Sequence, residues 1–163
     1  MAQTSTTLSG EVSHKANITG TDISISTSGS ISSTSTVLTG SGKLAVRDLV
    51  TVSGTGNNNR TFTVKAVVST TEFTVEETIS ANDNADGSTT FTLDHTGFVT
   101  DKAKGDGYYS QPDGVHTVAY HPGATINDDS TIGLIMQGSL ATTPTEDDWF
   151  DISDTSIDQP NLD

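Results

Sequence analysis

Residues that could do acid–base or nucleophilic chemistry are present in this chain, but no motif positions them. Its histidines are His14, His95, His116 and His121, and it has no cysteine, which excludes thiolate nucleophiles and thiolate metal sites. Serines and aspartates are abundant, but there is no Gly-x-Ser-x-Gly turn, no His-Glu-x-x-His pair and no Gly-rich loop ending in Gly-Lys-Ser or Gly-Lys-Thr. We therefore expect a protein that is not an enzyme.

One acidic segment has the spacing of the first half of a calcium-binding loop. Asn82, Asn84 and Asp86 place side-chain oxygens at positions one, three and five, and Gly87 stands at position six. Leu93 occupies position twelve, where such a loop carries a bidentate glutamate. A polar hairpin turn explains the same residues without an ion and is the favoured interpretation. No cofactor is expected, and these three residues are the candidate Ca²⁺ ligands.

Aromatic residues that could anchor a partner gather in the second half of the chain. Trp149 and Phe150 follow the acidic loop Glu146-Asp147-Asp148, and Tyr108 and Tyr109 are adjacent further upstream. The single tryptophan is interpreted first as a core anchor, because a buried aromatic side chain supplies a large apolar area. An exposed Trp-Phe pair would instead suit a protein interface, where Trp and Tyr often dominate the binding energy. The candidate interface residues are Trp149, Phe150, Tyr108 and Tyr109.

Short runs of alternating polar and apolar residues fill most of the chain, and no stretch has helical apolar spacing. Thr61-Phe62-Thr63-Val64 and Glu72-Phe73-Thr74-Val75 show the period of two that puts one face of a strand in a core and the other in water. The segment from Gly54 to Asn59 predicts a turn, because Gly and Asn tolerate positive φ. The pattern is all-β and predicts strands at Asp22–Ser26, Ser35–Leu38, Leu49–Ser53, Thr61–Val68, Glu72–Ile79, Thr89–Asp94, Val115–Tyr120, Ser130–Ala141 and Trp149–Ile152.

These strands are predicted to form two small antiparallel β domains. Residues 1–41 are an extended Ser/Thr-rich arm, which either carries the first two strands or is a polar linker. Residues 42–99 form an SH3-like small barrel built on a meander. The charged, Gly-containing residues 100–107 are the linker, and residues 108–163 form an acidic, incomplete β-sandwich module with a C-terminal tail.

Composition and charge restrict the partners. Hydrophobic residues make up 31% of the 163, so the core is thin, and we expect a homo-oligomer, a trimer or larger, to complete its burial. The net charge is −14, of which residues 105–163 carry −11 without any Lys or Arg. Such a surface repels phosphates, so neither nucleic acid nor a membrane is expected as a partner. The N-terminus lacks the pattern of a signal peptide, which predicts a protein made in a cytoplasm and not exported by a classical route.

Two parts of the chain resemble sequence patterns of known protein modules. Asp113–Tyr120 and Gln137–Ile152 match a Gly-Leu/Val-His-Thr-Val strand followed by Gln-Gly-Ser-Leu-Ala-Thr-Thr-Pro-Thr-Glu-Asp-Asp-Trp-Phe-Asp-Ile, and Asp48–Val75 matches a small barrel with asparagines in a hairpin loop. Both resemble modules of structural proteins from tailed phages, especially marine phages that infect cyanobacteria. In the first module further strands should follow the Trp-Phe-Asp-Ile strand. Because few residues remain after it here, we expect a symmetry mate or a neighbouring virion protein to cover the open sheet.

The resemblance implies a structural protein of the virion, assembled in the host cytoplasm. We expect a capsid decoration or cement protein on the outer surface, with the major capsid protein or other virion proteins as partners. The arm would lie along the shell, the barrel above it, and residues 108–152 would project outward. A tail or head-fibre adaptor is the alternative within this class. A bacterial carbohydrate-binding or adhesin module is the alternative outside it, with Trp149, Tyr108 or Tyr109 as the glycan platform.

Overall fold

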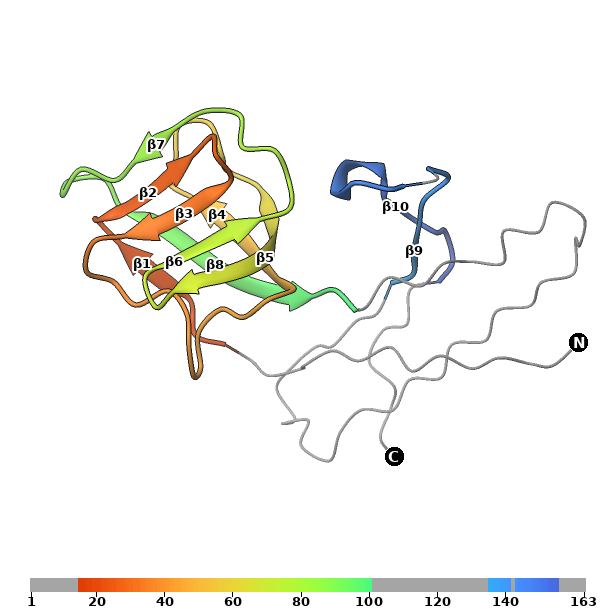
Figure 1. The fold of residues 1–163 in the computed structure, drawn as a ribbon, viewed down its shortest axis with the longest axis horizontal. Coiled ribbons are helices and arrows are strands. Elements are labelled where there is room, and N and C mark those ends of the chain that lie inside the picture. Colours follow the sequence, from red (N-terminus) through yellow and green to blue (C-terminus); the bar gives the residue numbers. More distant parts are fainter. Residues whose placement is uncertain (1–14, 101–134, 142, 156–163) are drawn as a thin grey trace, which may run out of the picture. The chain divides into compact units, whose positions relative to one another are not determined.

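The computed structural model describes residues 15–100, 135–141 and 143–155, which belong to two compact units, residues 1–103 and residues 104–163 (Figure 1). The prediction of an all-β protein is confirmed, because every extended element among these residues is a strand and the sole helix is a single turn of 3-10 helix. The first unit holds one eight-stranded antiparallel sheet, and the second holds a two-stranded one. No helix in the described part of the chain is long and apolar enough to cross a membrane.

The eight-stranded sheet closes on itself in a barrel-like way. Its strand order is β1-β8-β4-β5-β6-β3-β2-β7. The long strand β5 turns the corner, since its first residues pair with β4 and its later ones with β6. At the other side β1 passes into β2 through two residues only. The strands are β1 (Ile18–Gly20), β2 (Ile23–Ser26), β3 (Ser30–Ser33), β4 (Asp48–Ser53), β5 (Thr61–Ser69), β6 (Glu72–Val75), β7 (Asp83–Asn84) and β8 (Phe91–Phe98).

Because polar and apolar residues alternate, every second side chain of these strands, usually the apolar one, lies inside the barrel-like sheet. In β4 and β6 each buried residue alternates with a partly exposed one, as the period of two predicts. Phe62, Phe73 and Phe91 are fully buried, and each such side chain contributes about 1.5–3 kcal/mol relative to exposure. The buried core consists of Ile18, Ile23, Ile25, Ile31, Leu38, Leu44, Val50, Val52, Phe62, Val64, Phe73, Val75, Ile79, Phe91 and Leu93.

Most strand predictions in the first unit are confirmed, with shifted ends. The meander of β4, β5 and β6 and the turn between β4 and β5 are present. The strand expected at Glu72–Ile79 ends at Val75, and the one expected at Thr89–Asp94 runs from Phe91 to Phe98. That last strand does not extend the meander beyond β6, because it returns to pair with β4 on the opposite side.

The Ser/Thr-rich segment that was expected to be an extended arm is largely part of the folded sheet. Its described part, residues 15–41, supplies β1, β2 and β3 of the same sheet that holds β4 to β8. The strand predicted at Ser35–Leu38 is wrong. The chain turns there because the Asp22 carboxylate accepts hydrogen bonds from the backbone N–H groups of Ser35, at 2.7 Å, and Thr36, at 2.9 Å.

In the second unit the described strands are short. β9 (Gln137–Gly138) and β10 (Phe150–Asp151) pair antiparallel, and the 3-10 helix η1 (Glu146–Asp148) lies between them in sequence. Of the strand predicted at Ser130–Ala141, residues 130–134 lie outside the described residues, and only Gln137–Gly138 of the remainder is extended and paired. The strand predicted at Val115–Tyr120 and most of the expected linker also lie outside the described residues.

Candidate functional site

The two-stranded sheet of β9 and β10 and the residues flanking β9 present apolar side chains to solvent. Ile135 is 50% exposed, Leu140 93% and Phe150 50%, and we call these three residues the hairpin surface. None of the described residues from 135 to 155 is buried. A two-stranded sheet is marginally stable in water unless other residues pack on it. The hairpin surface is therefore the described part of the second unit with the most exposed apolar side chains.

Backbone and side-chain hydrogen bonds set the register of this sheet. Phe150 lies opposite Gly138 and Asp151 opposite Gln137. Gln137 Nε2 donates to Asp151 Oδ1 at 2.9 Å, which adds a side-chain bond across the pair. Thr155 Oγ1 donates to the Ile152 carbonyl at 2.7 Å and closes the turn after β10. These bonds hold Phe150 in a fixed position on the sheet.

The acidic loop before β10 is a capped helical turn. The N–H and the hydroxyl of Thr145 both donate to Asp148 Oδ2, each at 2.7 Å. These two bonds, the backbone one first, lower the pKa of the Asp148 carboxyl below its ordinary value, so it is ionised at neutral pH. Asp147, Asp151 and Asp154 are also exposed. The hairpin surface therefore lies in the same short segment as a group of exposed carboxylates.

The predicted interface residues are only partly within the described chain. Phe150 is half exposed and Trp149 is partly buried, and neither belongs to the buried core formed by the described residues. The interpretation of Trp149 as a core anchor stays a prediction, because much of the second unit lies outside the described residues. Tyr108 and Tyr109 lie outside the described residues.

The three candidate calcium ligands lie on and around the edge strand β7, where two of them hold the backbone. Asn82 Oδ1 accepts the Thr27 N–H at 2.8 Å. Asn84 lies in β7 opposite Ser24 of β2. Asp86 Oδ1 accepts the Ser88 hydroxyl at 2.7 Å and the backbone N–H of Thr89 at 3.0 Å. These contacts are those of a polar turn, the interpretation that the sequence favoured, and Ca²⁺ binding stays a prediction.

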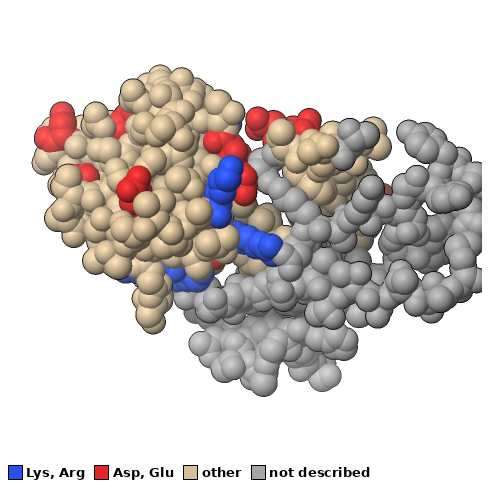
Figure 2. All heavy atoms as spheres, in the orientation of Figure 1, with Lys and Arg blue, Asp and Glu red and all other residues tan. Residues whose placement is uncertain are grey.

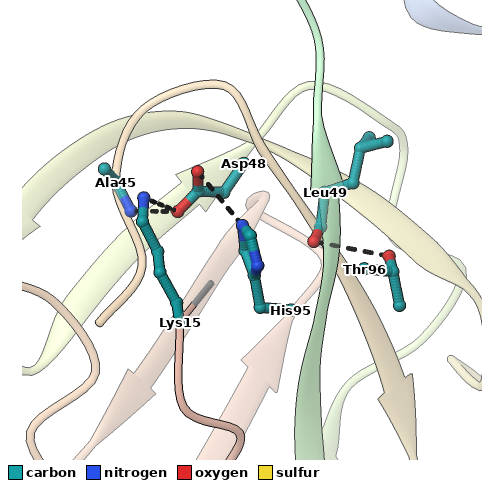
Figure 3. A network of polar contacts seen from close by, with 6 residues as sticks. All are labelled: Lys15, Ala45, Asp48, Leu49, His95 and Thr96. Atoms are coloured by element: carbon teal, nitrogen blue, oxygen red, sulfur yellow. Dashed lines mark hydrogen bonds and ion pairs between the residues drawn. The ribbon is translucent and has the colours of Figure 1, made fainter. Parts of the chain in front are cut away.

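A buried polar cluster lies where the chain enters the first unit, and we call it the Asp48 cluster (Figure 3). Lys15 Nζ lies 2.5 Å from Asp48 Oδ2, and the two side chains are 4% and 3% exposed. The Ala45 N–H donates to the same oxygen at 2.6 Å. His95 Nε2 lies 3.4 Å from Asp48 Oδ1, and its side chain is 8% exposed. A cation, a carboxylate and an imidazole thus meet away from water.

The local backbone explains how His95 reaches this position. β4 and β8 pair with a register shift between Leu49 and Val50, and Gly97 at this irregularity has φ 152°. His95 is paired with Val50, two residues beyond Asp48 along β4. The bulge re-aims the side chains of β8, and His95 turns toward the carboxylate.

Uncharged side chains cover most of the face of the first unit shown in Figure 2. The visible Lys and Arg side chains lie toward one edge of it, beside several acidic groups, and other acidic groups are scattered. In residues 15–100, 135–141 and 143–155, no group of three or more His, Asp or Glu could hold a metal ion.

Comparison with known proteins gives no further guide. No protein family matches the chain, and the searches of curated proteins and of solved structures found no match either.

The Asp48 cluster is the feature that sequence reasoning missed. Its three members are distant in the sequence, 33 residues separating Lys15 from Asp48 alone. Lys15 stood in the segment expected to be an arm, and His95 stood one residue beyond the strand predicted at Thr89–Asp94. The signal that could have found them is weak: Lys15 is a single charged residue just before β1, and Asp48 is a single charged residue at the start of β4.

Proposed function

We propose that the chain is a non-enzymatic structural protein of a tailed-phage virion, a decoration or cement protein on the outer face of the shell. The observation that supports the proposal is the hairpin surface, in which Phe150 on β10 and Ile135 and Leu140 on either side of β9 are apolar and exposed. A sheet of this size gains stability when another protein covers it. The partner would be the major capsid protein or another virion protein.

The charge of the chain supports an outer location. Residues 105–163 carry −11, which disfavours contact with packaged nucleic acid and limits association between particles. The same charge favours a partner surface that presents basic groups around an apolar centre. Binding at many lattice positions would let individually weak contacts stabilise the particle.

Because much of the expected arm is part of the folded sheet, less of the chain is left to lie along the shell than the sequence predicted. Residues 15–41 are part of the barrel-like sheet, so at most residues 1–14 remain to lie along a shell. The barrel-like unit then serves as a rigid body that carries the second unit. Oligomerisation as a trimer or larger assembly remains part of the proposal, because the hairpin surface suits a neighbouring copy as well as another virion protein.

Counting the protein in purified phage particles tests the proposal. Quantitative mass spectrometry against labelled standard peptides should give a copy number comparable to that of the shell subunits. A copy number of a few per particle would move the protein to a tail or head-fibre adaptor, the alternative within the class. Absence from purified particles would refute both, and binding of a soluble glycan by the isolated protein would favour the adhesin alternative.

A further inference from the structure

The Asp48 cluster has the arrangement of a self-reacting pair. Lys15 Nζ lies 2.5 Å from Asp48 Oδ2, and both side chains are almost completely buried. Since Oδ2 is bonded to Cγ, the amine nitrogen is at most one C–O bond further from the carboxyl carbon. This is close to the ~3–3.5 Å at which reacting atoms stand in a near-attack arrangement.

We propose that Lys15 and Asp48 join in an isopeptide bond, an amide between Nζ and Cγ that forms without an added cofactor. Two opposite charges held in a low-dielectric interior are costly, and a proton transfer from the ammonium to the carboxylate removes both. The products of that transfer are a neutral amine and a carboxylic acid, which are the two partners of amide formation. Burial also keeps out the water that would reverse the reaction.

The step balances with the groups present. Lys15 Nζ gives one proton to Oδ2 and attacks Cγ with the lone pair so released, which places the developing negative charge on Oδ1. The Cγ–Oδ2 bond then breaks, Oδ2 takes a second proton from Nζ, and it leaves as water. Oδ1 becomes the carbonyl oxygen of the amide. Nothing is oxidised or reduced, and no further reactant is needed.

His95 is placed to assist at the atom where charge develops. Its Nε2 is buried, lacks a hydrogen-bond partner among the described residues and faces Oδ1 at 3.4 Å. A donor that meets an oxygen only as it becomes negative stabilises the transition state more than the ground state. The Ala45 N–H, 2.6 Å from Oδ2, holds the carboxyl group in place for the attack.

The bond would tie together two strands that both flank β8. Lys15 stands just before β1 and Asp48 opens β4, and β1 and β4 pair with opposite edges of β8. The cross-link would therefore close the chain across three adjacent strands and fix its entry into the sheet. This inference is independent of the proposed function, although a covalent clamp suits a protein that bears mechanical load.

The mass of the purified full-length chain, measured after denaturation, tests the bond directly. We expect a mass lower than the calculated one by a single water molecule. Lys15→Arg keeps the positive charge but removes the reactive amine, so this variant should have its full calculated mass. Asp48→Asn should form the same amide with loss of ammonia. A wild-type mass equal to the calculated one would identify an ordinary buried ion pair and overturn the proposal.

Digestion with trypsin locates the bond. An acylated Lys15 is not cleaved, so the digest should contain a branched species that joins residues 1–43 to residues 48–60, with trypsin sites otherwise at Lys43, Arg47 and Arg60. A cyclic imide at Asp48 would also lose water, but Lys15 would then be cleaved, and residues 1–15, 16–43 and 48–60 would appear as separate peptides. Loss of water without the branched species would therefore overturn the proposal as well.

The role of His95 is tested by the rate at which the isopeptide bond forms. The protein is produced in unfolded form, dissolved in denaturant and refolded, and the branched species is followed over time. His95→Leu should slow the appearance of the branched species on the order of 10²-fold, and His95→Gln, which keeps an N–H donor, should slow it less. Circular dichroism confirms that each variant has refolded. Equal rates in the wild type and both variants would show that His95 takes no part in the reaction. The existence of the Lys15–Asp48 bond would still be decided by the mass of the wild-type protein.

Discussion

Replacing Leu140 and Phe150 with serine tests whether the hairpin surface is a contact area in the particle. Leu140 is 93% exposed and Phe150 50% exposed. Complete burial of such a side chain contributes about 1.5–3 kcal/mol, so Leu140 retains nearly all of this gain for a partner and Phe150 about half. The double variant should therefore lose roughly 2–4 kcal/mol of binding free energy. At about 1.4 kcal/mol per tenfold, this weakens binding roughly 30- to 1000-fold.

Competition during assembly measures this loss without the need for a separate binding assay. Wild type and the double variant are supplied in equal amounts while particles form, and mass spectrometry gives their ratio in purified particles. We expect strong depletion of the variant. Val68→Ser serves as the matched control, because Val68 is 58% exposed but lies on the barrel-like sheet of the first unit.

The outcome also separates binding from folding. The double variant leaves the buried core untouched, since neither residue contributes to it. Its thermal unfolding should match that of the wild type. Incorporation of the double variant at the input ratio, with normal folding, would refute the assignment of the hairpin surface as a contact area.

Three further changes test the fold of the first unit. Phe73→Ala, at a fully buried position, should lower the free energy of unfolding by about 3–5 kcal/mol in urea titration, and a loss below about 1 kcal/mol would contradict its burial. Gly54→Ala should destabilise by more than about 1 kcal/mol, because Gly54 has φ +85° and an added Cβ would strike the Thr90 carbonyl; an unchanged urea midpoint would be inconsistent with this turn. Hydrogen bonds from the Ser33 hydroxyl, and next from the Ser35 hydroxyl, hold the pKa of Asp22 well below its ordinary 3.8. As the pH falls, Asp22 is therefore protonated in the unfolded chain before it is protonated in the folded one. The Asp22 carboxylate thus stabilises the fold above its unfolded pKa, and this stabilisation is lost as the pH falls below it. Asp22→Asn should therefore flatten the decline of the urea midpoint between about pH 5 and about pH 2, and an unaltered slope would contradict the carboxylate's role.

The periodicity of the sequence was sufficient to predict most of the strands that carry the core, although not β1 and β3, which supply Ile18 and Ile31. Val50, Val52, Phe62, Val64 and Phe73 alternate with polar residues, and all five are buried as that alternation requires. What it could not predict was the pairing. β8 pairs with β4 and not with β6, and this depends on contacts between residues 39 to 50 positions apart. Local patterns hold no information on such long-range pairing.

The Ser/Thr-rich segment misled prediction for a related reason. Ile23, Ile25 and Ile31 alternate with serines, which resembles both a strand and a polar linker. The structure buries all three isoleucines, because β2 and β3 form a hairpin against the rest of the sheet. The strand at Ser35–Leu38 was misplaced because its apparent alternation is interrupted by the hydrogen bonds to Asp22. A charged residue thirteen positions upstream decided where this strand pattern ends.

The polar residues of this chain substitute for part of the missing apolar core by fixing its turns. Asp22 binds the segment after β3, Asp86 binds the residues before β8, and Asn58 Nδ2, 2.6 Å from Asp83 Oδ2, ties the β4–β5 turn to β7. Each of these bonds satisfies groups that would otherwise compete with the sheet for partners. A chain with 31% hydrophobic residues can thus form one well-packed unit while its exposed apolar residues remain available for contact. Two features stand apart from these turn-fixing bonds: the exposed apolar side chains of the hairpin surface, on which the proposed contact rests, and the buried Lys15–Asp48 pair, on which the proposed isopeptide bond rests.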